Sequence, residues 1–240
     1  PLTPISFFDL DNGNAGGVNG TFLKTSDRGV TWTIVTSGSD QVIRSIYFTN
    51  INNGYAVAYS STILKTTNGG DSWFFSSNYP RERLNSTYFT DENSGYVVGD
   101  LGTVFKTFDG GENWIKLNGG VNNNFNSVFF TSSNQGYIVG DGGKILKTDD
   151  SGINWTLKTS GTSLGLNFVY FVSETIGYIA GNNGKILKTS DSGEQWINTP
   201  TGVNINLNSL FFVDENYGFA VGDIGLILKT TDGGASWVSS

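Results

Sequence analysis

Six tryptophans divide this chain into equal intervals. They follow one another at a constant spacing of 41 residues, without one insertion or deletion: Trp32, Trp73, Trp114, Trp155, Trp196 and Trp237. A fixed period of about 40 residues is typical of propeller blades or of helical repeats, and the local pattern distinguishes the two. The chain is therefore one structural unit written six times.

The pattern within a repeat is that of short strands. In the fourth repeat, four runs rich in apolar, β-branched and aromatic residues are separated by turn clusters of Gly, Asp, Asn and Ser: 127–131, 136–140, 144–148 and 154–159. Such runs predict strands joined by tight reversals, and no segment shows a sustained helical period. The sequence therefore predicts an all-β fold, a six-bladed β-propeller with four antiparallel strands per blade, as a single domain over residues 1–240.

The turn before each tryptophan carries the most regular motif, Lys-Thr-x-Asp/Asn-x-Gly-x-x-Trp. A carboxylate or amide at its fourth position can accept backbone N–H groups of the turn, and the glycine permits a left-handed backbone. The tryptophan then buries a large apolar area. We therefore predict a structural role for the six residues at the fourth position: Asp27, Asn68, Asp109, Asp150, Asp191 and Asp232.

A lysine also recurs eight residues before each tryptophan, from Lys24 to Lys229. Six lysines in six different blades cannot share one ligand. We predict that each pairs with a carboxylate of its own blade or lays its stem along apolar surface.

These motifs resemble a known repeat. The segment from Thr25 to Trp32 matches the Asp-box (BNR) pattern Ser/Thr-x-Asp-x-Gly-x-Thr-Trp throughout. With Gly-Tyr-x-Val-Gly and Ile-Leu-Lys-Thr upstream, as in residues 136–155, the chain is similar to the propeller family of photosystem II stability and assembly factors. The resemblance covers essentially the whole chain and implies the fold. It implies no single activity, since Asp-box repeats also occur in sialidases, sortilin-type receptors and secreted glycosidases.

The chain also departs from that family. Its members are known with seven blades and a basic surface patch, whereas this chain has six repeats and only four arginines. The sequence therefore does not favour a photosynthetic role.

Composition narrows the classes of partner and location. With 14 basic and 21 acidic residues the net charge is −7, which argues against binding nucleic acid. The absence of cysteine from an Asn/Ser/Thr/Gly-rich all-β chain is common among bacterial secreted proteins, so we expect a secreted, periplasmic or extracellular location. No apolar run reaches 18 residues, and we expect no membrane insertion.

The residues present argue against catalysis. Histidine is absent, which removes the commonest general base, the Ser-His-Asp arrangement and the usual zinc ligands. A sialidase-type arginine clamp would have to be drawn from four arginines, and topology places Arg28 on the face opposite to the other three. We therefore expect no enzymatic activity, no catalytic residue, no cofactor and no metal.

Propeller topology sorts the loops by face. The second turn of each blade and the connections between blades share one face, where propellers usually bind ligands around the central channel. At the entry to the first strand of each blade, 29 residues before each tryptophan, stand Thr3, Arg44, Asn85, Asn126, Asn167 and Asn208. Two interpretations are open: a polar ring at the channel mouth, or asparagines that each cap their own turn.

Repeats two and three break the symmetry on this face. Arg44 replaces an asparagine, and Tyr59 stands where other repeats have Asp100, Asp141 or Asp223. The connection over residues 76–85 adds Tyr79, Arg81 and Arg83. These five residues predict an aromatic and basic lip that would accept the acidic or C-terminal group of a partner, unless they are ordinary surface drift.

Two functions follow from this reading. The first is a non-catalytic binding module or assembly scaffold that holds a protein or peptide on the loop face. The alternative is a carbohydrate-binding or degenerate sialidase-like propeller that binds a glycan through Tyr59, Tyr79 and the asparagines.

Overall fold

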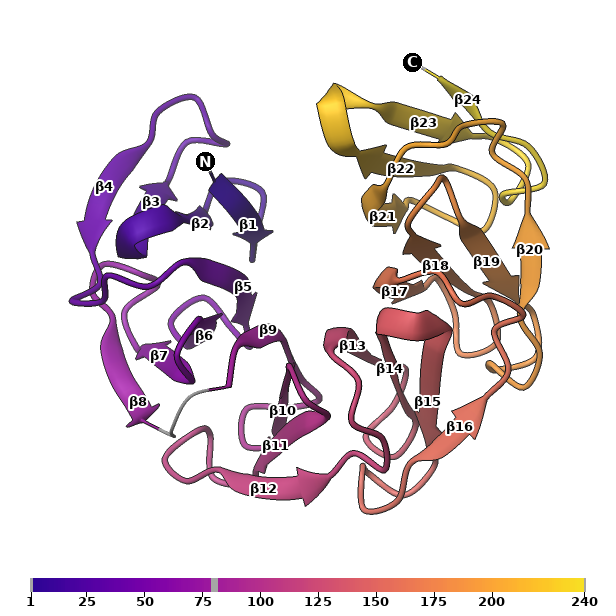
Figure 1. Ribbon diagram of the computed structural model, residues 1–240. Helices are drawn as coiled ribbons and strands as arrows, with labels where there is room; N and C mark the ends of the chain where they lie inside the picture. Colours follow the sequence, from indigo (N-terminus) through magenta and orange to yellow (C-terminus); the bar gives the residue numbers. More distant parts are fainter. Residues whose placement is uncertain (1, 79–81, 240) are drawn as a thin grey trace. The chain divides into compact units, whose positions relative to one another are not determined.

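Six four-stranded antiparallel sheets make up the protein (Figure 1). The computed structural model describes residues 2–78 and 82–239, and in each sheet the strands pair in chain order. The predicted all-β, six-bladed propeller with four antiparallel strands per blade is confirmed. The chain divides into two compact units of three blades each, residues 1–119 and 120–240. Across the described residues, no helix is long and apolar enough to cross a membrane.

The first unit contains the first three blades. Their strands are β1 Leu2–Phe7, β2 Gly13–Gly17, β3 Thr21–Thr25, β4 Thr33–Thr36, β5 Ile43–Phe48, β6 Gly54–Ala58, β7 Thr62–Thr66, β8 Phe74–Asn78, β9 Leu84–Phe89, β10 Gly95–Gly99, β11 Thr103–Thr107 and β12 Ile115–Asn118, with the short 3₁₀ turn η1 Val18–Gly20.

The second unit contains the last three blades. Their strands are β13 Phe125–Phe130, β14 Gly136–Gly140, β15 Lys144–Thr148, β16 Thr156–Lys158, β17 Leu166–Phe171, β18 Gly177–Gly181, β19 Ile186–Thr189, β20 Ile197–Thr199, β21 Leu207–Phe212, β22 Gly218–Gly222, β23 Ile227–Thr230 and β24 Val238–Ser239, with the 3₁₀ turns η2 Asp141–Gly143 and η3 Asp223–Gly225.

Burial follows the order of the strands in a blade. Every residue of the second strand is buried in β6, β10, β14 and β18. The fourth strand is mostly exposed, as in β12 and β16. Strands covered on both faces read as continuous apolar runs, whereas an outer strand has one wet face and edge. The core of each unit is therefore built from the first three strands of its blades, together with repeat tryptophans such as Trp114 and Trp196.

A tyrosine of the second strand joins three of the four pairs of neighbouring blades within the units, whereas the first blade has Asn14 at this position, and its amide donates to the Gly69 carbonyl of the second blade at 3.4 Å. The Tyr137 ring stacks on Phe171 of the next blade at a centroid distance of 4.2 Å. Its hydroxyl donates to the carbonyl oxygen of Ser192, in that blade's Asp-box turn, at 2.7 Å. Tyr55 repeats both contacts in the first unit, with Phe89 at 3.9 Å and the Gly110 carbonyl at 2.7 Å. Burial raises the pKa of Tyr55 to about 12, so the hydroxyl remains a donor.

The glycine that precedes this tyrosine is required by a ring rather than by its backbone angle. A Cβ at Gly95 would lie 2.3 Å from the Phe89 ring of the same blade, and Gly136 faces Phe130 in the same way at 2.5 Å. No side chain fits there without moving the phenylalanine out of the core.

The Asp-box turns are closed by their own side chains. In the third blade, Thr107 Oγ1 donates to Asp109 Oδ1 at 2.8 Å and accepts the Gly111 N–H at 2.9 Å. The same carboxylate accepts the Asn113 N–H at 2.9 Å and its side-chain amide at 2.8 Å. These hydrogen bonds lower the pKa of Asp109 to about 2, and the bond from the Asn113 side chain contributes most. These hydrogen bonds lie within one turn, and a structural role for all six positions stays a prediction.

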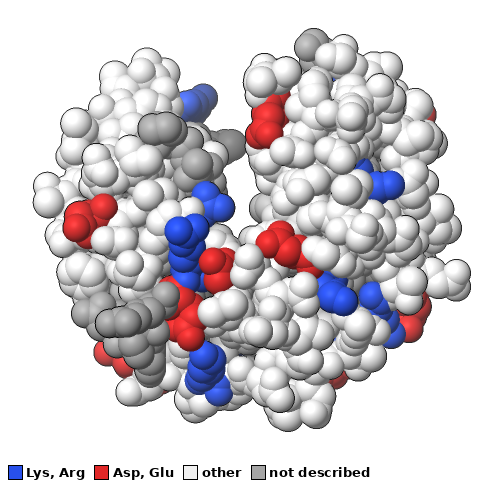
Figure 2. Space-filling view, viewed as in Figure 1, with Lys and Arg blue, Asp and Glu red and all other residues white. Residues whose placement is uncertain are grey.

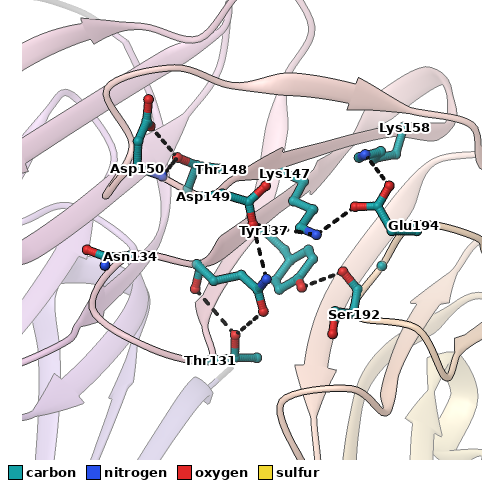
Figure 3. Close-up of polar contacts among 12 residues, drawn as sticks. Thr131, Asn134, Tyr137, Lys147, Thr148, Asp149, Asp150, Lys158, Ser192 and Glu194 are labelled. Atoms are coloured by element: carbon teal, nitrogen blue, oxygen red, sulfur yellow. Dashed lines mark hydrogen bonds and ion pairs between the residues drawn. The ribbon is translucent and has the colours of Figure 1, made fainter.

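The recurring lysine reaches across to the next blade. Lys147 Nζ lies 2.7 Å from Glu194 Oε1, and Lys158 holds the other oxygen of Glu194 at 2.7 Å (Figure 3). Lys24 pairs with Asp71 at 2.6 Å across the same kind of boundary. The predicted pairing within one blade is wrong for Lys24 and for Lys65, which pairs with Glu112 at 2.7 Å, because each partner stands two residues before the tryptophan of the following blade.

The tyrosine contact sets the first prediction. We expect Tyr137→Phe to lower the free energy of unfolding by about 1 kcal/mol, because the ring stack is kept while the partly buried Ser192 carbonyl loses its side-chain donor. Urea denaturation followed by tryptophan fluorescence measures it. Tyr217→Phe, at an exposed tyrosine, is the matched control and should change stability by less than about 0.5 kcal/mol. An equal effect of the two substitutions would contradict the assigned role.

The lowered carboxylate pKa values set the second prediction. Asp109, Asp232 and Glu194 each have a pKa of about 2 in the folded protein, against about 4 in an unfolded chain. Their stabilisation is therefore complete above about pH 5 and is lost as the pH falls through about 4 to 2. We expect Glu194→Gln to lower stability at pH 7 and to reduce its loss between pH 5 and pH 2, with Glu174→Gln as a control. Urea midpoints across the pH range test this, and parallel profiles for the two variants would refute it.

Candidate functional site

Three segments of the first unit meet at the second turn of the second blade, residues 59–61. The Tyr59 N–H donates to the Val42 carbonyl at 3.3 Å, in the connection from β4 to β5. The Ser61 N–H and hydroxyl both donate to the Glu82 carbonyl at 2.9 Å, in the connection from β8 to β9. The second turn and the two blade connections therefore share one face, as the topology predicts.

Two arginines converge on the ring of Tyr59. The guanidinium carbon of Arg83 lies 4.8 Å from the ring centroid, and that of Arg44 lies 5.7 Å from it. Arg44 comes from β5 and Arg83 from the residue before β9, so the cluster joins two blades. Both arginines are exposed and Tyr59 is half-buried. We call Arg44, Tyr59 and Arg83 the arginine cluster.

The two guanidinium groups have no acidic partner in the part of the chain that the structure describes. The ion pairs found there involve Arg28 and five lysines, and none includes Arg44 or Arg83. Both guanidinium groups lie over the Tyr59 ring and belong to exposed side chains, so their N–H groups are accessible to solvent or a ligand. Planar guanidinium groups in such an arrangement bind carboxylates with paired, charge-assisted hydrogen bonds.

The regular blades show why the cluster forms only here. In the fourth blade the carboxylate of Asp141 accepts one hydrogen bond from Asn124 at 3.0 Å and another from Asn126 at 3.1 Å. Tyr59 occupies the position of Asp141 in the second blade, and Arg44 occupies that of Asn126. A neutral ring cannot accept an amide clamp, but its face attracts cations. The second blade, with Tyr in place of this Asp, therefore has the arginine cluster where the fourth blade has hydrogen bonds between asparagine amides and a carboxylate.

The four predicted asparagines are held in structural hydrogen bonds. Each side-chain amide donates to the second turn of its own blade: Asn85 to Asp100 at 2.9 Å, Asn126 to Asp141 at 3.1 Å, Asn167 to Asn182 at 2.9 Å and Asn208 to Asp223 at 2.8 Å. Two of them also donate to the next blade, Asn126 to the Leu166 carbonyl and Asn167 to the Leu207 carbonyl. A binding role for them stays a prediction. Tyr79 and Arg81 lie outside the described residues.

A cavity of about 590 Å³ adjoins the same turn. It is lined by Gly38, Ser39, Asp40, Gln41, Ser60, Thr62 and Phe75. Gln41 links its two sides, since its amide donates to Asp40 Oδ1 at 2.6 Å and its carbonyl oxygen accepts the Ser60 hydroxyl at 3.1 Å. The Phe75 side chain is 49% exposed.

Sequence reasoning missed this cavity, although a signal was present. Phe75 is the only aromatic residue two positions after a repeat tryptophan, and Asp40 is the only acidic residue eight positions after one. The signal was weak because the two residues lie 35 positions apart and only the fold brings them together.

Charges on the face drawn in Figure 2 are few, and basic and acidic side chains are interspersed. That face therefore carries no broad basic surface. Across the described residues, no group of three Asp, Glu, His or Cys side chains is placed to hold a metal ion.

The comparison with known protein families identifies the family of this chain. Residues 80–163 and 156–239 both match the family described as "Photosynthesis system II assembly factor YCF48". The chain belongs to this family. No curated protein matches it by sequence.

Solved structures agree with this assignment. A structure described as "YCF48 bound to D1 peptide" matches with a TM-score of 0.81 and 25% identity, over 99% of this chain and 80% of that one. A second, YCF48 from Cyanidioschyzon merolae, matches with a TM-score of 0.55 and 17% identity over 95% of both chains. The GH74 xyloglucanase from Xanthomonas campestris has a TM-score of 0.79 at 12% identity, over 99% of this chain and 45% of that one, a likeness of fold alone.

The asparagine bonds set a third prediction. We expect Asn126→Asp to lower the free energy of unfolding by about 2 kcal/mol, because it replaces the amide donor with a carboxylate facing Asp141 and the Leu166 carbonyl. Asn122→Asp, at an exposed position, adds the same charge and should cost less than about 0.5 kcal/mol. Chemical denaturation at pH 7 compares the two. If the variants are equally stable, the amide does not bear the role given to it.

Proposed function

We propose that this YCF48-family chain is a non-catalytic assembly scaffold that binds an acidic or C-terminal segment of a partner protein. The observation that carries the proposal is the arginine cluster, in which two exposed guanidinium groups share one aromatic ring and have no acidic partner among the described residues. A peptide-bound member of the same family, 25% identical to this chain, supports a peptide as the ligand.

The geometry suits a terminal carboxylate. Arg44 and Arg83 approach Tyr59 from two different blades, so an anion between them would bond to both guanidinium groups at once. Stacking on the ring restricts the arginine side chains before binding, which reduces the entropy lost on complex formation. Both arginines are exposed, so water and salt weaken the attraction, and we expect salt-sensitive binding of moderate strength.

The proposal of a non-catalytic role has a structural support. Arg28, the remaining arginine among the described residues, is held in its Asp-box turn by an ion pair between its Nε and Asp11 Oδ1 at 2.7 Å. Because Arg28 is paired with Asp11, the described residues offer no third arginine for a sialidase-type clamp on a carboxylate. The chain also has no histidine and no cysteine to serve as base or nucleophile.

We further propose that the protein acts outside the cytoplasm, in a periplasmic or extracellular compartment. The support is compositional: a chain of 240 residues with no cysteine and abundant Asn, Ser, Thr and Gly. A glycan is the second candidate ligand, and the specific observation in its favour is the exposed ring of Phe75 beside the polar side chains of the cavity.

The fourth prediction tests peptide binding. We expect a fluorescein-labelled synthetic peptide with a free C-terminal carboxylate to bind, and amidation of that terminus to weaken binding about 10-fold, which corresponds to about 1.4 kcal/mol. Arg44→Ala combined with Arg83→Ala should weaken it at least as much, because the carboxylate loses both guanidinium groups. Fluorescence anisotropy at low and physiological salt measures these affinities.

Arg28→Ala removes one arginine from the other face of the same unit and serves as the matched control. It should leave the affinity unchanged. Equal loss from Arg28→Ala would contradict the site, and binding to a glycan array that depends on Phe75 but not on Arg44 would favour the second candidate.

A further inference from the structure

The cavity beside the arginine cluster has a chemistry of its own. We infer that it binds a lysine or arginine side chain of the same peptide, two to three residues before the carboxylate held by Arg44 and Arg83. This inference rests on the proposed function and adds a sequence preference to it.

Asp40 supplies the negative charge. Its Oδ1 accepts the Gln41 amide at 2.6 Å, and both residues line the cavity. No cation lies within ion-pair distance of Asp40 in the described chain, so its second oxygen is available to a ligand. A charge-assisted hydrogen bond to an ammonium or guanidinium group is the strongest bond that this oxygen can make.

Phe75 supplies the complementary surface. Its ring is 49% exposed and lines the cavity together with the hydroxyl-bearing residues Ser39, Ser60 and Thr62. Aromatic faces attract cations, and the methylene stem of a long basic side chain packs well on such a ring. Hydroxyl groups can accept the remaining N–H bonds of an ammonium group. The volume of about 590 Å³ accommodates a long side chain.

The position of the cavity sets the register of the ligand. Ser60 lines it, and the adjacent residue Tyr59 holds the two arginines. Neighbouring Cα atoms are about 3.8 Å apart, and an extended peptide advances about 3.4 Å per residue. A carboxylate at the arginine cluster therefore places the preceding two or three residues next to the cavity, within reach of a long side chain.

The charges of the two subsites are opposite, and this favours one class of peptide. A basic residue followed closely by a free C-terminus matches Asp40 and the arginine cluster together. An acidic residue at that position would face Asp40 and be repelled. Specificity thus arises from a repulsive contact as well as an attractive one.

Three synthetic peptides test the inference: acetyl-Gly-Ser-Gly-Lys-Ala-Ala with a free C-terminus, and the same peptide with Ala or Glu in place of Lys. We expect the Lys peptide to bind the native protein about 10-fold more tightly than the Ala peptide and the Glu peptide more weakly than either. Asp40→Asn should remove the preference for Lys. Asp40→Lys should reverse it in favour of Glu, a gain that a merely damaged protein cannot show.

Glu174→Gln is the control, because it removes the same charge from an exposed site in the other unit and should keep the preference for Lys. Tryptophan fluorescence confirms that each variant is folded. Equal affinity for the three peptides, with binding still lost in the Arg44→Ala and Arg83→Ala protein, would overturn the inference and leave the proposed function standing. No binding of any peptide would overturn both, and Phe75-dependent binding of a glycan would assign the cavity to a sugar instead.

Discussion

Three of the four boundaries between neighbouring blades within the units depend on one contact, the stack of a second-strand tyrosine on the first-strand phenylalanine of the next blade. The tyrosine hydroxyl then donates to a carbonyl of that blade's Asp-box turn. Burial of two rings supplies most of the stabilisation, and the hydrogen bond fixes the spacing of the blades. The Asp-box turn must hold its shape for that carbonyl to be in place. The carboxylate of Asp109 or Asp191 therefore acts on the neighbouring blade as well as on its own turn.

Repetition of this contact explains which residues are open to functional change. The ring, the glycine beneath it and the turn carboxylate are all committed to packing, and Gly95 shows how little space is left. The side chains of the second turn and of the blade connections take no part in this packing, because they form hydrogen bonds mainly with one another. A substitution such as Asp to Tyr at residue 59 changes that local network and leaves the blade intact. Binding can therefore differ from blade to blade while the fold stays the same.

The sequence was sufficient for the fold because its signals are local and repeated. The spacing of Trp32 to Trp237 and the turn residues predicted the blades and the number of strands in each. The ion-pair partners of Lys24 and Lys147 were harder to predict from the sequence, since each acidic residue stands 47 positions away in the next blade. The same limit applied to the site. Arg44, Tyr59 and Arg83 stood out as exceptions, but their convergence on one ring is a tertiary contact, and Phe75 and Asp40 were not recognised at all.

The arginine cluster also shows how a clamp can become a binding site with few substitutions. In the fourth blade two amides satisfy one carboxylate, and all three side chains are neutralised or bonded. Tyr59 has no carboxylate to accept a hydrogen bond from an amide. An asparagine at residue 44 would therefore lose its hydrogen-bond partner, at a cost of about 1 kcal/mol. Arginine at residue 44 avoids that loss because its charge is attracted to the ring and its N–H groups remain hydrated. Arg83, from the next blade, joins the same ring. The site therefore follows from replacing the carboxylate of the second turn with an aromatic ring. The two arginines at this ring are then available to bind a carboxylate of a ligand.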